Sequence, residues 1–320
     1  MERSRLPDSL GERFRVADAI RLGVPPGRLR ALDLARPFHA VRSVDEVAPP
    51  PFVLVDRRGE KRGSLEREHL ERALDYATRM AEHEFFCGVT AAVLHGLPLP
   101  AAVLVRSLDV GVLTPHRLPR SVGIRGHEAS PKTTRVHTES ISGLRATTPA
   151  STWAMLGAML HDPYDLVAAG DAVVREWRVP APLASLAELE SALAAGRRVG
   201  IVKLRDALPR IRTRSASRPE TRCRLVLTDA GLPEPLLNHE VVERGAALGC
   251  VDLAYPELRI ALEYEGEHHL LDPQQWARDI ARYDRLREAG WIVIRVTKSE
   301  LFSSPSVVVE RVRRAIRTRA

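Results

Sequence analysis

The stretch "IALEYEGEHH", residues 260–269, places three glutamates and two histidines at the end of an apolar run. Side chains alternate between the two faces of a strand, with a period of two residues. Ile260 and Leu262 are therefore expected on one face, and Glu263 and Glu265 on the other. Two carboxylates on one face of a buried strand indicate a site with chemistry rather than a packing surface.

A third carboxylate comes from the segment before this strand. Asp252 follows an apolar pair, and the turn-length segment "PELR" at 256–259 lets the two strands pair as an antiparallel hairpin. That pairing would bring Asp252 close to Glu263. Gathered carboxylates repel one another unless a cation neutralises them, and hard cations such as Mg²⁺ or Mn²⁺ take oxygen ligands. The cluster predicts a site for metal-assisted phosphodiester hydrolysis.

The surrounding sequence predicts a domain over residues 210–320 in which one mixed sheet is flanked by helices. The expected order is a helix at 217–231, strands at 237–243, 248–256 and 258–266, a helix at 276–290, a strand at 291–297, and a helix from about 306.

Several motifs in this domain together resemble the domain-of-unknown-function 559 family. They are Asp252, "ExEG" at 263–266, His269, "DxxRxxxLxxxG" at 279–290, "WIVIRVT" at 291–297 and the preceding "SRPETRCRLVL" at 217–227. That family is similar to very-short-patch-repair endonucleases and belongs to the PD-(D/E)XK nuclease superfamily. The resemblance, over about residues 215–305, implies a restriction-endonuclease-like fold.

The resemblance also implies roles for individual residues. Asp252 and Glu263 would be metal ligands, and Glu220 stands where many superfamily members carry an acidic residue on the first helix. Glu265 occupies the position of the superfamily lysine, and we assign it to catalysis and to the metal. Because a glutamate there cannot supply positive charge, His269 is the expected substitute as general base.

Each assignment has a plainer alternative. Asp279 and Arg282 are three residues apart on one helix face and could form a surface ion pair, or one that braces the site. Glu220 could simply stabilise the N-terminus of its helix, because a carboxylate in the first turn interacts favourably with the helix dipole. Trp276 and Trp291 are expected in the core. The two adjacent histidines could bind zinc, although neighbouring imidazoles on one segment point apart.

The charge of the chain is concentrated in its last third. The formal net charge of residues 197–320 is +6, out of +7 for the whole chain. A basic domain attracts polyanions such as nucleic acid, so we assign Arg282 and Arg285 as nucleic-acid contacts; a solvated arginine-rich surface is the alternative.

The first 63 residues predict a winged helix-turn-helix. Apolar spacing indicates a helix from Phe14 to Leu22, the adjacent prolines after it suit the start of a second helix, and the strand "FHAVRSV" follows at 38–44. Arg28 and Arg30 on the second helix are the expected DNA contacts. This segment and "GLRATTPASTWAMLGAML", 143–160, resemble abortive-infection type antitoxin proteins. A plain interaction module is the alternative.

The middle region, 64–209, predicts an antitoxin-like mixed α/β domain. A charged helix is expected at 65–83, strands at 107–115 and 121–128, and a helix start at Thr148. No phosphate loop or nucleophile elbow occurs in it. The arginine-rich and serine-rich segment at 210–218 is expected to be a linker to the last domain.

These observations predict an α+β protein that is a Mg²⁺- or Mn²⁺-dependent DNA endonuclease with an N-terminal module binding DNA or a partner. A non-catalytic DNA-binding transcriptional regulator of antitoxin type is the rival, because of the glutamate in the lysine position. We expect DNA as a partner, a homodimer or a protein encoded nearby as further partners, no membrane segment, and a cytoplasmic location.

Overall fold

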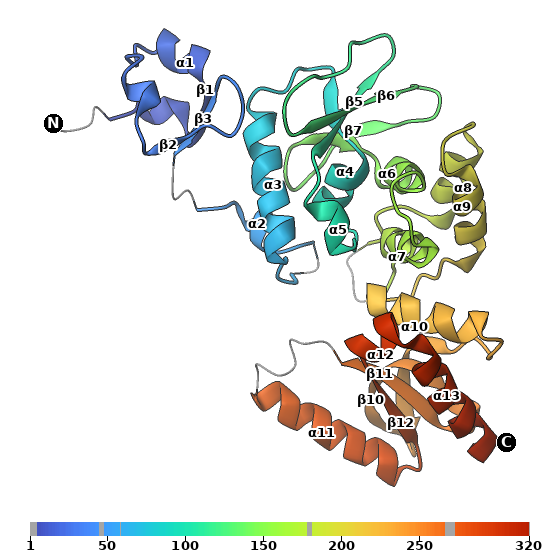
Figure 1. Ribbon diagram of the computed structural model, residues 1–320. Coiled ribbons are helices and arrows are strands. Elements are labelled where there is room, and N and C mark those ends of the chain that lie inside the picture. The colour runs from blue at the N-terminus through green and yellow to red at the C-terminus, as the bar shows by residue number, and fades with distance from the viewer. Residues whose placement is uncertain (1–4, 45–47, 58, 178–180, 266–272, 320) are drawn as a thin grey trace. The chain divides into compact units, whose positions relative to one another are not determined.

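The computed structural model describes residues 5–44, 48–57, 59–177, 181–265 and 273–319, and only the backbone of 273–279. It is an α+β protein, as the sequence predicts, and the strands of its described residues form three separate sheets. The chain divides into two compact units (Figure 1). The first unit comprises 1–161 and 183–208, and the second comprises 162–182 and 209–320.

The N-terminal part of the first unit is a small three-stranded antiparallel sheet with one short helix. Its strand order is β1-β3-β2. The elements are β1 (Arg13–Arg15), α1 (Val16–Arg21), β2 (Leu34–Ala35) and β3 (Val41–Val44), with 3-10 turns at Asp8–Leu10 and Arg28–Arg30. Its core gathers Leu10, Phe14, Ala19, Val24, Leu29 and Leu34.

Both helices expected here are shorter in the structure. Phe14 lies in β1, so α1 has six residues, and the second helix is only the 3-10 turn at Arg28–Arg30. Leu22 is half exposed, because the chain turns at Gly23, whose φ is +80°, and buries Val24 instead. The winged helix-turn-helix is therefore not confirmed.

The rest of the first unit is a mixed five-stranded sheet with helices. The strand order is β6-β5-β4-β8-β7, in which β5 and β6 are parallel and β4 and β5 antiparallel. The strands are β4 (Glu84–Phe86), β5 (Leu108–Leu113), β6 (Ile124–Ala129), β7 (Val136–Thr138) and β8 (Arg145–Thr147). The helices are α2 (Pro51–Leu54), α3 (Ser64–Ala77), α4 (Gly88–Leu94), α5 (Ala101–Leu104), α6 (Pro149–Leu156), α8 (Leu186–Ala194) and α9 (Ile201–Ala207).

Local sequence signals account for several helix boundaries in this unit. Thr148 caps α6, as predicted, because its hydroxyl accepts from the Ser151 backbone amide. A capping box between Ser185 and Glu188 starts α8. No helix in the described part of the chain combines the length and the apolar content needed to cross a bilayer.

The second unit is a four-stranded mixed sheet with helices. Its strand order is β12-β11-β10-β9, antiparallel from β11 to β9 and parallel between β11 and β12. The elements are α7 (Pro163–Val174), α10 (Arg218–Asp229), β9 (Leu236–Glu243), β10 (Ala246–Tyr255), β11 (Ile260–Glu265), α11 (Pro273–Glu288), β12 (Ile292–Thr297), α12 (Lys298–Ser303) and α13 (Pro305–Arg319).

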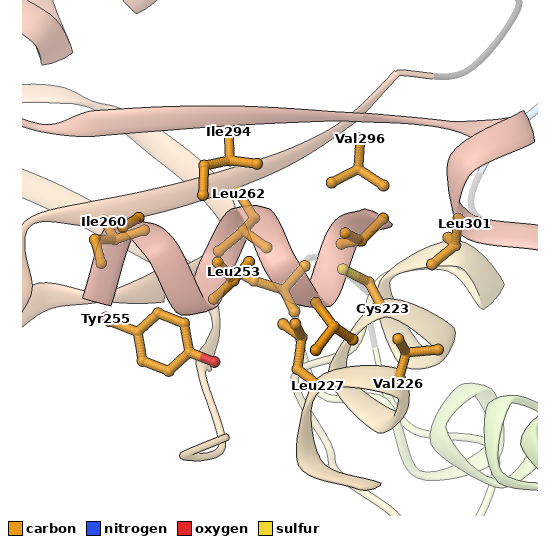
Figure 2. Packing of buried hydrophobic residues seen from close by; sticks show 14 of the residues in the cluster. Cys223, Val226, Leu227, Leu253, Tyr255, Ile260, Leu262, Ile294, Val296 and Leu301 are labelled. Atoms are coloured by element: carbon orange, nitrogen blue, oxygen red, sulfur yellow. The ribbon is translucent and has the colours of Figure 1, made fainter. Parts of the chain in front are cut away.

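Apolar side chains cover both faces of this sheet. One face packs with α10, α12 and α13 around Leu253, Ile260, Leu262, Ile294 and Val296, as Figure 2 shows. The other face packs with α11 through Ala254, Ala261, Leu286 and Trp291. Burial of these side chains on two faces is the main stabilising contribution to the unit.

The 210–218 segment is not a free linker. Its Ser215 is 2% exposed and the Arg212 backbone amide donates to Asp171 of α7 at 2.7 Å. Although α7 falls in the expected middle region, it packs against α10 within the second unit. The polar composition of the segment did not make it a surface linker, because a buried acid accepts a hydrogen bond from it and holds it against α7.

Candidate active site

The predicted hairpin and the predicted two-faced strand are both present. Leu253 of β10 lies opposite Leu262 of β11, and the pairing of the two strands runs from there to Tyr255 and Ile260, so Asp252 and Glu263 are the residues just beyond its end. Leu262 packs in the core beside α10, whereas Glu263 contacts Arg282 of α11. The glutamates therefore lie on the α11 face of the sheet, because side chains alternate along β11.

Glu263 is a buried carboxylate held by an arginine. It is 4% exposed, and Arg282 donates to both of its oxygens: Nη1 to Oε1, and Nη2 to Oε2 at 3.3 Å. Arg282 Nη1 also donates to the Cys250 carbonyl at 2.7 Å. The Arg282 side chain can pass close to β10 because Gly249 has no Cβ. A Cβ at Gly249 would lie 2.8 Å from Arg282 Cδ. Such a two-pronged pair fixes both position and charge.

Glu265 has a cation of its own. Arg295 of β12 donates to Glu265 Oε1, and its guanidinium lies over the Tyr283 ring of α11. Arg295 stands beside Glu263 in the parallel pairing of β11 and β12. Positive charge therefore reaches this face from the neighbouring strand and helix, although residue 265 itself is acidic.

Asp252 and Glu220 form a second acidic group at β10. The Asp252 carboxylate accepts from the Tyr264 backbone amide at 2.8 Å. Glu220 is 6% exposed and accepts from the Ala216 amide at 2.9 Å and from Asn238 Nδ2 at 2.7 Å. Asn238 is held in the left-handed region, with a φ of +46°, which Asn tolerates better than most residues.

Burial, and after it the neighbouring Asp252 charge, raise the pKa of Glu220 to about 7, against the lowering effect of its hydrogen bonds. A carboxyl group with this pKa can hold or release a proton near neutral pH. The position in the first turn of α10 also fits the plainer interpretation, since Ser217 and Glu220 bond each other at the start of that helix.

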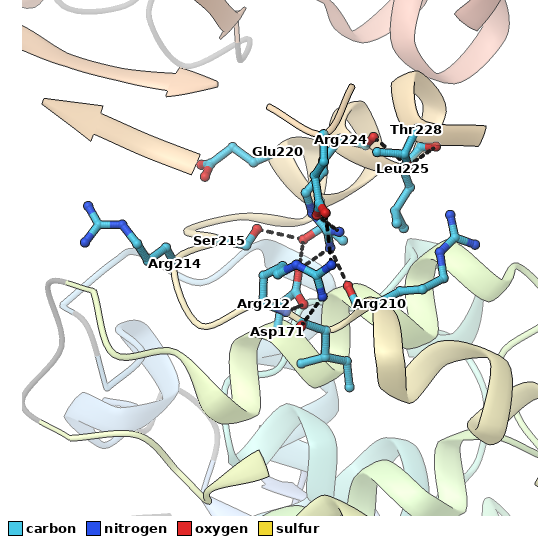
Figure 3. A network of polar contacts seen from close by, with 12 residues as sticks. Asp171, Arg210, Arg212, Arg214, Ser215, Glu220, Arg224, Leu225 and Thr228 are labelled. Atoms are coloured by element: carbon cyan, nitrogen blue, oxygen red, sulfur yellow. Dashed lines mark hydrogen bonds and ion pairs between the residues drawn. The ribbon is translucent and has the colours of Figure 1, made fainter. Parts of the chain in front are cut away.

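A polar network fixes the helix that carries Glu220 (Figure 3). Asp171 of α7 accepts from Thr221 Oγ1 at 2.7 Å and pairs with Arg224 at 3.3 Å. Both members of this ion pair are 2% exposed, and burial raises the pKa of Asp171 to about 6. Arg224 also donates to Glu234 at 2.9 Å. These buried contacts hold α10 against α7.

Other assigned residues are distributed as follows. His269 lies outside the described residues, as does the side chain of Asp279, so the ion pair predicted between Asp279 and Arg282 stays a prediction; Arg282 pairs with Glu263. Arg285 is exposed on α11. Trp291 is 7% exposed in the core, as expected. No group of three or more metal-ligating side chains was found among the described residues.

The two N-terminal arginines differ from each other. Arg28 pairs with Asp33 through two hydrogen bonds, of 3.0 and 2.8 Å, so its charge serves the local fold. Arg30 is exposed.

Sequence reasoning missed two residues that shape the site and gave a third other partners. Asn238 and Arg295 lie on β9 and β12, and Arg282 was assigned to nucleic acid or to Asp279. The alternation of β12 could have indicated Arg295, because it is the one charged residue inside the apolar run "WIVIRVT" at 291–297. Nothing in the local sequence indicates the Arg282 contact, which depends on the packing of α11.

Together these features define an α+β protein in which a helix-covered mixed sheet carries the buried Glu263 and the covering helix α10 carries the buried Glu220. Two Mycobacterium tuberculosis proteins, the uncharacterized proteins MT2308 (strain CDC 1551 / Oshkosh) and Rv2248 (strain ATCC 25618 / H37Rv), are each 33% identical to this chain over 236 residues. The alignment covers 73% of this chain and 82% of each relative. The chain belongs to the family of these mycobacterial proteins. No family model and no solved structure matches it.

Proposed function

We propose that the protein is a divalent-metal-dependent endonuclease that hydrolyses phosphodiester bonds in DNA through the second unit. The observation that carries the proposal is two buried glutamates, Glu220 of α10 beside Asp252 and Glu263 of β11 beside Arg282. A buried charge costs free energy unless it is fully paired. Buried acids that shift each other's pKa are therefore candidates for a functional site. The motif resemblance to PD-(D/E)XK nucleases supports the same interpretation.

The donor set suits a hard cation. Asp252 and Glu263 would hold Mg²⁺ or Mn²⁺, with Glu265 beside them, and all offer carboxylate oxygens. Burial and the Asp252 charge both raise the pKa of Glu220, and a divalent ion bound beside Asp252 would lower it by favouring the ionised carboxylate. When bound, the ion would activate water and stabilise charge on the phosphate.

The chain's own residues have separate roles in this proposal. Glu220, held by Asn238 and Ser217, receives or releases a proton near neutral pH. Arg282 holds the Glu263 carboxylate in place and adds positive charge next to the phosphate. His269, which lies outside the described residues, remains the proposed general base.

The second candidate is a DNA-binding regulator in which the nuclease fold is only a scaffold. It is favoured by the arginine partners of Glu263 and Glu265, because each already neutralises a carboxylate that a metal would need. In that case the arginines are permanent structural partners and the protein binds DNA without cutting it.

A plasmid-nicking assay with Mg²⁺ or Mn²⁺ tests the proposal. Wild-type protein should convert supercoiled DNA to open circles, and Asp252→Asn should reduce the rate at least about a hundredfold. Asp284→Asn is the matched control, since Asp284 is an acid on α11 whose pair with Arg287 is exposed. If wild type and Asp252→Asn bind DNA equally and neither nicks it, the regulator is the correct interpretation.

A further inference from the structure

The first unit contains a basic hollow that the proposed catalytic unit does not explain. Its volume is about 910 Å³, and its lining comes from the β2–β3 segment, the residues just after α3 and the loop before β6. We call it the arginine hollow. It is lined by Val16, Arg36, Pro37, Phe38, His39, Ala40, Arg42, Arg79, Arg120, Ser121 and Val122.

The charge of the arginine hollow is not balanced by its lining. Four arginines line it, and none of the lining residues is acidic. Within the part of the chain that the structure describes, none of the four forms an ion pair with a carboxylate; Arg13 and Arg28, from the same small domain, pair with Asp75 and Asp33. An unbalanced group of guanidinium ions attracts anions.

Three of these arginines donate to backbone carbonyl oxygens, and one of them is Arg36, which donates to the Arg30 carbonyl at 3.0 Å. Arg42 donates to the Leu29 carbonyl at 2.8 Å, and Arg79 donates to the His39 carbonyl at 3.4 Å. Each guanidinium has five N–H donors, so such bonds orient the group and leave further donors for a ligand. Burial, and after it the nearby positive charge of Arg36, lower the pKa of Arg42.

The remaining lining has the character of a nucleic-acid surface. Arg120 is exposed and Val122 is 95% exposed beside it, so a cationic group and an apolar contact stand next to each other. Guanidinium groups match phosphate oxygens with two parallel hydrogen bonds, whereas apolar side chains contact sugars and bases.

We propose that the arginine hollow binds the phosphate groups of a DNA backbone. The inference deepens the proposed function, because it names where the substrate is held outside the catalytic unit. It can fail independently, since binding is measured in EDTA and requires no cleavage. The hollow was not foreseen, because its arginines come from three segments far apart in the chain.

Fluorescence anisotropy with the full-length protein and a labelled short DNA duplex in EDTA tests the proposal. Arg79→Ala combined with Arg120→Ala should weaken binding roughly tenfold and reduce the slope of log affinity against log salt by about 2. The matched control is Arg67→Ala combined with Arg197→Ala, which removes two exposed arginines outside the hollow. It should change affinity by less than about twofold.

The proposal is overturned if the Arg79/Arg120 and Arg67/Arg197 double variants lose DNA affinity equally. It is also overturned if the Arg79/Arg120 variant binds DNA with full affinity. Displacement of the duplex by submillimolar mononucleotide, with no loss from the control pair, would show a free-nucleotide site instead and overturn the DNA assignment. Arg36→Ala with Arg120→Ala is the second test pair, because both side chains are exposed and their loss leaves the core intact. Matching thermal midpoints confirm that each variant is folded.

Discussion

Arg282 supplies a positive charge on the same sheet face as Glu265, the acidic residue at the end of β11. Arg282→Ala removes a cation from a carboxylate that is 4% exposed, so we expect a loss of about 3 kcal/mol in the free energy of unfolding. Arg282→Lys should recover part of it, because a lysine keeps the charge but not the two-pronged contact. Urea unfolding measures the effect.

Arg285→Ala is the control for this substitution, because Arg285 is exposed on the same helix. It should change stability by less than about 0.5 kcal/mol. Equal losses for Arg282→Ala and Arg285→Ala would mean that the contact with Glu263 contributes nothing.

Glu220 makes stability depend on pH. Its pKa in the folded protein, about 7, lies above the usual value of 4.5, so the folded state binds the proton more tightly than the unfolded state does. The resulting stabilisation is complete below pH 4.5 and is lost as the pH rises through 7. Glu220→Gln can keep the bonds from Ala216 and Asn238 and cannot ionise, so the loss between pH 4.5 and 8 should shrink. Urea unfolding at both pH values checks this, and an unchanged pH dependence would contradict it.

At the scale of elements, glycines set how closely some segments approach. Gly200 begins α9 with a φ of +81°, and a Cβ there would lie 2.2 Å from the Gly157 carbonyl oxygen, just after α6. Gly231 has a similar φ of +77° with nothing within 4 Å of its Cβ position. A Cβ would therefore strain the backbone similarly at Gly200 and Gly231, but only at Gly200 would it also clash with a neighbouring atom.

Alanine substitutions separate the two effects. Gly231→Ala should cost about 1 kcal/mol, and Gly200→Ala about 3 kcal/mol or more, because the segments after α6 and before α9 must move apart. Thermal unfolding of both variants tests the difference. Equal costs would show that backbone conformation alone decides both positions.

At the scale of the whole molecule, the second unit is built from two separate parts of the chain. Asp171 of α7 holds Arg212, Thr221 and Arg224 of the later part. A fragment of residues 210–320 lacks this acid and leaves the buried Arg224 without one of its carboxylates. We therefore expect its free energy of unfolding to be about 3 kcal/mol lower than that of a fragment of residues 162–320. It should accordingly unfold at a lower urea concentration.

Circular dichroism during urea unfolding compares the two fragments, with the full-length chain as reference. Identical midpoints for 210–320 and 162–320 would mean that α7 is dispensable for the second unit. A cooperative transition only in the longer fragment supports the division of the chain found here.

The sequence alone determined the α+β class, the boundaries of α10 and the strands that follow it to within two residues, and the face on which Glu263 and Glu265 lie. These features depend on local signals: the cap at Ser217, alternation along β11, and a turn between β10 and β11. The tertiary structure decided the partners. Arg282, Arg295 and Asn238 reach the acids from separate elements, α7 joins the second unit, and the arginine hollow assembles from three distant segments. Long-range packing brings these groups together, and nothing in the residues beside them specifies it.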